Sequence, residues 1–148
     1  MYIVKTNSEK ETIELGKRIG EKLKKGMVIV LTGDLGSGKT KLTEGILTYF
    51  NLQNEISSPT FTIVNEYHTN KDLNIYHFDV YRLSDSDEFF AIGGEEYFEK
   101  GACIIEWGEM IQDVLPKDYI HITFEKDEND IEFRNIKIEI IGDIDFEI

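Results

Sequence analysis

The sequence is poor in cysteine and in long apolar runs, and both shortages exclude classes of protein. Its single cysteine, Cys103, rules out an internal disulfide and fits a reducing compartment. The longest apolar run, 27–31, is far too short to span a bilayer. Residues 1–10 lack the basic start and apolar stretch of a signal peptide. We therefore expect a soluble cytoplasmic protein with no membrane partner.

Basic residues are also scarce, with three arginines (Arg18, Arg82 and Arg134) and a formal net charge of −13. Because phosphate contacts need Lys and Arg, this charge argues against direct binding of nucleic acid. The acidic residues are densest near the C-terminal end, at Glu125, Asp127, Glu128, Asp130 and Glu132. This acidic run is interpreted either as the solvated tip of a hairpin or as a docking face for a basic partner protein.

The 148 residues, 41% of them hydrophobic, fit one domain over 1–148 without linkers or repeats. In the front half, strands are expected at 2–5 and 27–31. A helix is expected over 8–25, with a capping box of Ser8 and Glu11 at its start and Gly26 as its stop. Apolar residues at i, i+4 spacing mark a second helix after residue 38. The front half therefore alternates strand and helix.

The rear half adds hairpins to this pattern. We expect strands at 62–69 and 73–82 around a turn at 70–72, and a buried strand at 102–107. Short helices are expected at 85–92 and just before Gly101. A second hairpin should pair 119–126 with 131–140. Together the elements predict an α/β fold with a mixed parallel and antiparallel sheet flanked by helices.

The stretch 33–40, GDLGSGKT, matches the phosphate-binding loop pattern G-x-x-x-x-G-K-[ST] between a buried strand and a helix. Glycines let backbone N–H groups surround phosphate oxygens, and the helix N-terminus adds partial positive charge. Lys39 is expected to reach the β- and γ-phosphates, and the Thr40 hydroxyl to bind Mg²⁺. The residues expected at the nucleotide are Gly33, Asp34, Leu35, Gly36, Ser37, Gly38, Lys39 and Thr40.

The nucleotide base is expected to be adenine, so the expected cofactors are ATP and Mg²⁺. A GTPase would carry D-x-x-G after the loop and N-K-x-D late in the chain. The first pattern is absent from the sequence. The second occurs as NKDL at 70–73, where the spacing is wrong and a hairpin turn is expected.

Two carboxylates end apolar strands, Asp79 after IYHF and Glu106 after CII. In open α/β sheets, ligands bind at the carboxyl ends of strands. We expect one carboxylate to hold Mg²⁺, directly or through water, and the other to position the attacking water. Which of the two is the direct metal ligand is left open.

Two further residues have alternative interpretations. Thr60, in SSPTF at 57–61, could sense the γ-phosphate with its hydroxyl by analogy with GTPase switches, or could lie in an ordinary Ser-Pro turn. Trp107, the only tryptophan, could face the nucleotide or simply pack against the core.

The motifs GDLGSGKT, SPTF, HFDVYR and IIEW, in this order and spacing, resemble the TsaE (formerly YjeE) family, the small bacterial P-loop ATPases of tRNA threonylcarbamoyladenosine synthesis. The resemblance covers 12–116. It implies an ATPase required for threonylcarbamoyl modification of adenosine 37 in tRNA. It also implies that the ATPase does not modify tRNA itself but joins a complex with the TsaD and TsaB proteins, in which ATP hydrolysis supports multiple turnover.

Carried onto this sequence, the resemblance puts the phosphate loop at 33–40, the metal site at Thr40 and Glu106, and Asp79 at the nucleotide. It puts Ser8 and Glu9 near the base. The family usually has a second threonine after GKT, where this chain has Lys41, so nucleotide affinity is expected to differ.

Two other functions compete with the partner-dependent ATPase. A small-molecule kinase shares the loop but usually closes an arginine-bearing lid, for which this chain is poorly equipped. A nucleotide-dependent binding module with negligible hydrolysis is the third candidate. Arg82 is the only arginine close to the expected site. Strand alternation turns it away from Asp79, although a bend just after Asp79 could redirect it. Slow hydrolysis by the isolated chain is therefore expected.

Overall fold

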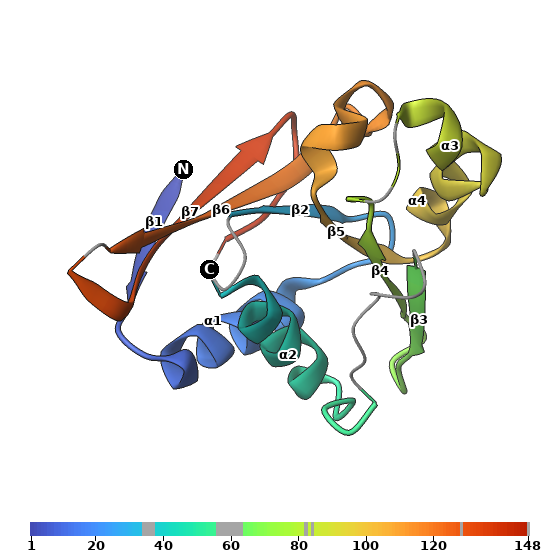
Figure 1. Ribbon diagram of the computed structural model, residues 1–148. Coiled ribbons are helices and arrows are strands. Elements are labelled where there is room, and N and C mark those ends of the chain that lie inside the picture. The colour runs from blue at the N-terminus through green and yellow to red at the C-terminus, as the bar shows by residue number, and fades with distance from the viewer. Residues whose placement is uncertain (34–37, 56–63, 82, 84, 128, 148) are drawn as a thin grey trace.

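The computed structural model describes residues 1–33, 38–55, 64–81, 83, 85–127 and 129–147. One seven-stranded sheet forms the middle layer, with helices on both of its faces (Figure 1). The strands are β1 (Tyr2–Thr6), β2 (Val28–Thr32), β3 (Val64–His68), β4 (Asn74–Asp79), β5 (Ala102–Glu106), β6 (Tyr119–Asp127) and β7 (Asp130–Ile141). The helical elements are α1 (Glu9–Lys22), α2 (Lys39–Tyr49), α3 (Ser86–Ala91), η1 (Gly94–Glu96), α4 (Tyr97–Lys100) and η2 (Gly108–Val114).

The sheet has the order β1-β7-β6-β2-β5-β4-β3. The four central strands β6, β2, β5 and β4 are parallel to one another. Antiparallel strands complete both sides, with β3 next to β4 and the β7–β1 pair next to β6. The prediction of a mixed sheet in an α/β fold is therefore confirmed. The carboxyl ends of the four parallel strands lie along one edge, where ligands bind in such sheets.

Alternation along the central strands divides the core into two halves. On β2, Ile29 and Leu31 face the layer of α1 and α2, whereas Val28 and Val30 face α3 and η2. The same alternation on β5 buries Cys103 completely in the second half. This burial raises the pKa of the Cys103 thiol from 9.0 to about 12.

Helices α1 and α2 cross in close contact because glycines lie at the crossing. A Cβ at Gly45 would come within 2.1 Å of the carbonyl oxygen of Ile13, and one at Gly16 within 2.3 Å of that of Leu42. No side chain fits at these distances. The two glycines thereby bring the beginning of α2, which follows the phosphate-loop sequence, close to α1.

The largest errors in the predicted boundaries concern the ends of the first helix and of the strand expected at 73–82. Helix α1 ends at Lys22 rather than Lys25, because Leu23 adopts an extended backbone and buries its side chain in the core. Gly26 is therefore not the helix stop; its N–H donates to the carbonyl of Gly101. Strand β4 ends at Asp79 rather than residue 82, since the Asp79 carboxylate accepts the N–H of Tyr81 and turns the chain.

Helix η2 was not expected from the sequence. It follows β5 directly and begins after Trp107, whose left-handed backbone (φ 66°) turns the chain out of the strand. Among the described residues, no helix has the length and apolar character needed to cross a membrane.

Candidate active site

Helix α2 begins at the edge of the sheet where the parallel strands end. Gly38 precedes it in a left-handed conformation (φ 111°), which favours glycine, and it has no side chain with which to cap the helix. The first N–H groups of α2 are thus available to an anion, supported by the helix dipole. Thr40 is exposed in this first turn, whereas Lys39 is 5% exposed. The other expected loop contacts, Asp34, Leu35, Gly36 and Ser37, lie outside the described residues.

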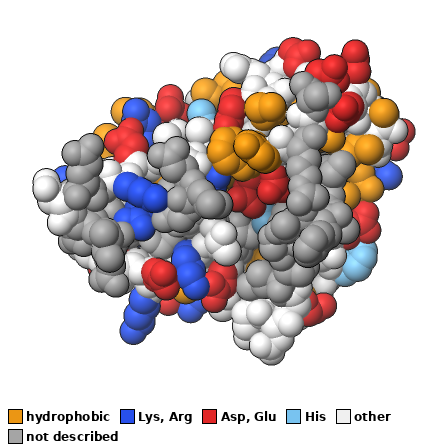
Figure 2. All heavy atoms as spheres, viewed as in Figure 1, with side chains coloured by type: hydrophobic (Ala, Val, Ile, Leu, Met, Phe, Trp, Pro, Cys, Tyr) orange, Lys and Arg blue, Asp and Glu red, His pale blue; other side chains and the backbone are white. Residues whose placement is uncertain are grey.

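The two expected carboxylates lie next to each other across the β4–β5 ladder. Asp79 is the register partner of Glu106, and Glu106 is in turn the partner of Leu31 on β2. Both carboxylates follow the alternation of residues that face the α1–α2 layer. On the face seen in Figure 2, acidic side chains gather near the middle, beside hydrophobic ones and next to atoms that are not described. The sheet therefore brings together two carboxylates that lie far apart in the sequence.

The Glu106 side chain is hydrogen-bonded to a histidine of β4. His77 Nε2 lies 2.6 Å from Glu106 Oε2, and the two side chains are 7% and 13% exposed. Because a carboxylate only accepts, His77 Nε2 donates the hydrogen. The other ring nitrogen, Nδ1, is buried and has no hydrogen-bond partner among the described residues.

Lys39 contacts the only tryptophan of the chain. Its Nζ lies 4.3 Å from the centroid of the Trp107 ring, a cation–π distance. The ring also contacts Tyr81, with centroids 4.8 Å apart, and packs against the core half that contains Val30. Trp107 therefore packs on the core and also touches the lysine expected at the phosphates, while a ring that faces the nucleotide stays a prediction.

The segment from Trp107 to Glu109 is held on β2. A Cβ at Gly108 would come within 2.5 Å of Val30, so the backbone lies directly on that side chain. Thr32 Oγ1, one residue before the loop sequence, lies 3.2 Å from Glu109 Oε2 and 2.8 Å from His121 Nε2. Thr32 can donate to the carboxylate and accept from the imidazole, so each of the two contacts has one donor and one acceptor. The contacts of Gly108 with Val30 and of Glu109 with Thr32 thus hold the backbone that directly follows Trp107 against β2.

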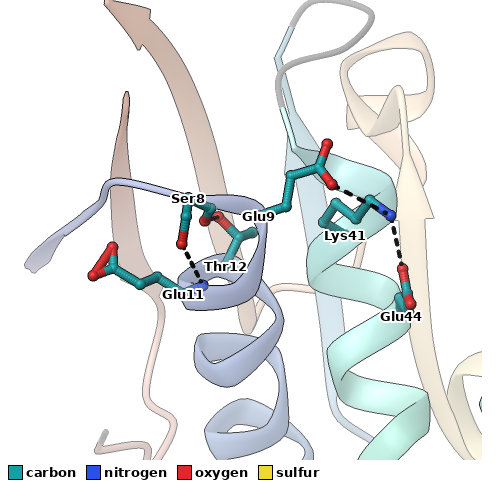
Figure 3. A network of polar contacts seen from close by, with 6 residues as sticks. All are labelled: Ser8, Glu9, Glu11, Thr12, Lys41 and Glu44. Atoms are coloured by element: carbon teal, nitrogen blue, oxygen red, sulfur yellow. Dashed lines mark hydrogen bonds and ion pairs between the residues drawn. The ribbon is translucent and has the colours of Figure 1, made fainter. Parts of the chain in front are cut away.

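On the other side of α2, Glu9 and Lys41 connect the two helices (Figure 3). Lys41 Nζ lies 3.8 Å from Glu9 Oε2 and 3.3 Å from Glu44 Oε2. Ser8 caps α1 by accepting the N–H of Glu11, so Glu9 stands in the first turn of α1. The residue that replaces the second threonine of the family pattern is thus engaged with carboxylates, next to the segment expected near the base.

The donor set fits a magnesium ion that is shared with a nucleotide. Mg²⁺ is usually bound by one or two carboxylates together with substrate phosphates and waters, not by a cage of protein ligands. In the part of the chain that the structure describes, no cluster of three or more His, Cys, Asp or Glu side chains could hold a metal alone. An ion shared with a nucleotide needs fewer oxygen ligands from the protein. Such oxygens are supplied by Asp79, Glu106 and the exposed Thr40 hydroxyl. Thr60 and Arg82 fall outside the described residues.

Sequence reasoning missed His77, although a signal was present. Alternation along β4 puts Ile75, His77 and Asp79 on one face, so His77 could have been assigned to the side of the carboxylates. The contact of Lys39 with Trp107 and the bonds of Thr32 had no such signal. They depend on η2, which only the tertiary structure reveals.

The buried strand β2, the loop sequence, helix α2 and the neighbouring acidic strand ends define an α/β protein of the P-loop class. The family model for "Threonylcarbamoyl adenosine biosynthesis protein TsaE" matches residues 6–136. The chain belongs to the TsaE family.

Individual relatives agree with this assignment. A Treponema pallidum protein described as "tRNA threonylcarbamoyladenosine biosynthesis protein TsaE" is 40% identical over 119 residues, covering 80% of this chain and 87% of that protein. A Bacillus subtilis protein of the same description is 38% identical over 133 residues, covering 87% and 82%. The crystal structure of YdiB from Bacillus subtilis superposes with a TM-score of 0.74 at 31% identity, covering 95% of this chain and 86% of that one.

Proposed function

We propose that the chain is a Mg²⁺-dependent ATPase that acts in the threonylcarbamoyl modification of adenosine 37 in tRNA. The observation that carries the proposal is the register pair of Asp79 and Glu106 beside the strand that leads into the loop sequence. This arrangement supplies carboxylates at the edge where the phosphates of a P-loop nucleotide would lie. Membership of the TsaE family supports the role in tRNA modification.

In this proposal each residue has a separate role toward the nucleotide, the metal or the attacking water. The Lys39 ammonium balances charge on the β- and γ-phosphates, more strongly as charge develops during transfer. Thr40 and Glu106 hold the metal, and Asp79 positions the attacking water. When bound, Mg²⁺ would neutralise negative charge on the phosphates. Thr60 senses the γ-phosphate, and Glu9 contributes near the base.

We further propose that hydrolysis is slow in the isolated chain and is completed by the TsaD and TsaB proteins in the cytoplasm. Phosphoryl transfer needs positive charge opposite the γ-phosphate. Arg18 belongs to α1, and Arg134 belongs to β7, which is separated from β5 and β4 in the sheet by β6 and β2. An arginine finger in trans is worth about 10³-fold or more in rate, so completion by a partner should be large.

The test is phosphate release by the isolated chain and by the chain mixed with TsaD and TsaB. Slow release that rises strongly with the partners supports the proposal. Arg82→Ala is the informative variant, since fast release alone that collapses in Arg82→Ala would reveal a finger within this chain and contradict partner completion. Glu106→Ala should raise the Mg²⁺ concentration needed, and Asp79→Ala should lower turnover.

The same assay separates the two competing functions. Transfer of labelled γ-phosphate to a member of a panel of small acceptors would establish a kinase. Nucleotide binding with slow release that neither partner changes would establish a nucleotide-dependent binding module.

A further inference from the structure

His77 is a buried polar residue to which the nucleotide chemistry above assigns no role. It lies on β4 two residues before Asp79, on the same face, and its register partner on β5 is Ile104. Its Nε2 donates to Glu106 Oε2 at 2.6 Å, with both side chains largely buried. His77 thus supports Glu106 from the core side of the carboxyl edge.

The bond to His77 restricts a side chain that has several torsions of its own. A glutamate has three side-chain torsions, and the register partner of Glu106 is another carboxylate, Asp79, whose charge repels it. The bond to His77 uses Oε2, so it sets the direction in which the second oxygen, Oε1, can point. A rigid imidazole on a central strand is well suited to this, since ring and strand leave little freedom.

The Nδ1 atom of His77, which has no hydrogen-bond partner in the described part of the chain, argues against a role in packing alone. A buried nitrogen without a hydrogen bond lowers the free energy of unfolding, and an apolar side chain would avoid that loss. The hydrogen bond from Nε2 to the Glu106 carboxylate explains why a polar ring occupies this position.

We propose that His77 is a positioning residue that orients Glu106 toward the divalent cation bound with the nucleotide. The proposal rests on the assignment of Glu106 to the metal in the proposed function. Hydrogen-bond partners of ligating carboxylates and imidazoles commonly change metal affinity by about 10–100-fold when removed. His77 therefore acts on the affinity for Mg²⁺ through Glu106, without touching ATP.

The experiment measures equilibrium binding of a fluorescent ADP analogue at increasing Mg²⁺ concentration. His77→Leu removes the donor, and His77→Gln retains an N–H near the position of Nε2. We expect His77→Leu to raise the half-saturating Mg²⁺ concentration about tenfold. His77→Gln should restore most of the affinity.

A matched control is available in His68, whose Nδ1 lies 2.8 Å from Asn74 Oδ1 at an exposed position on β3. His68→Leu should leave the Mg²⁺ dependence at the wild-type value. Thermal unfolding of each variant establishes that it is folded. Should His77→Leu not fold, His77→Met, with an unbranched side chain and no donor, takes its place.

A double-mutant cycle gives the sharper result. If His77 acts through Glu106, then His77→Leu should produce no further shift in the Glu106→Ala background. An additive shift overturns the positioning role, as does equal loss in His77→Leu and His77→Gln. If His77→Leu has the same Mg²⁺ dependence as the wild type, the positioning role is also overturned, while the proposed function stands. If Glu106→Ala itself has no effect on the Mg²⁺ dependence, the metal assignment fails and the positioning role fails with it.

Discussion

Lys39 begins α2 with its ammonium against the Trp107 ring, and this residue should decide nucleotide binding. Lys39→Ala is expected to lower ATP affinity and turnover by about 100-fold or more, because one charge that stabilises the phosphates is lost. Binding of a fluorescent ADP analogue and phosphate release measure the two effects. Lys17→Ala, at a solvent-accessible position of α1 with Glu14 as its ion-pair partner, is the matched control and should retain wild-type values. Wild-type binding by Lys39→Ala would contradict the P-loop assignment.

Trp107 should report the nucleotide optically. It is the only tryptophan, and its ring lies 4.3 Å from Lys39 Nζ. When the ammonium turns to phosphate, the electrostatic environment of the ring changes, so tryptophan emission should change saturably with ATP. The measurement is a fluorescence titration at concentrations where binding is established independently. A flat titration would mean that Trp107 serves core packing alone. Lys39→Ala, titrated in parallel, should lose the response.

At the level of residues, the sequence predicts which side chains belong to the candidate site better than it predicts which of them are in contact. Asp79 and Glu106 could be selected because each ends an apolar strand, and the sheet does bring them into register. Their roles toward metal and water stay predictions. The contact between Lys39 and Trp107 could not be foreseen, since it depends on a left-handed turn at Trp107 that no local pattern indicates.

At the level of elements, the crossing of α1 and α2 depends on missing side chains. Gly45→Ala is expected to lower the free energy of unfolding by about 1–3 kcal/mol, because its Cβ would meet the Ile13 carbonyl at 2.1 Å. Helix propensity alone predicts the opposite sign, since alanine is favoured over glycine by about 1 kcal/mol. Denaturant unfolding measures the difference.

Gly20→Ala on α1 provides the comparison for this substitution. Its added Cβ would meet the nearest atoms at 3.0 Å, so its neighbours need to move only slightly. We expect a smaller loss than for Gly45→Ala. A Gly45→Ala variant more stable than wild type would show that the helices can separate without cost.

The sequence predicts well whether a segment is a helix or a strand. It predicts less well where each element ends and which strands pair over long sequence distances. The strands and the principal helices fall where apolar periodicity predicts them. The end of α1 was misplaced because burial of Leu23 outweighs the turn preference of Gly26. The pairing of β1 with β7 joins the two ends of the chain, and η2 rests on Val30; both are tertiary contacts that leave no local trace.

At the level of the whole molecule, the charge predicts what the isolated chain will not bind. The net charge is −13, and 83–116, which spans α3 to η2, contains one basic residue, Lys100. We expect no saturable binding of tRNA by the chain alone at physiological salt, because too few cations are available to replace the counterions of the phosphates. Gel-shift titrations with and without TsaD and TsaB measure this. Tight binding by the isolated chain would contradict the expectation.

The buried thiol has a practical consequence for locating the partner surface. With its pKa raised to about 12, Cys103 stays protonated at neutral pH, and its complete burial keeps reagents away. The natural chain should therefore accept no maleimide dye while folded. Single cysteines introduced at exposed positions, Lys10→Cys on α1 and Gln112→Cys on η2, would then be the only labelled sites. The two dyes would lie on opposite faces of the sheet. The dye that is quenched or shielded on assembly would identify the face on which a partner docks.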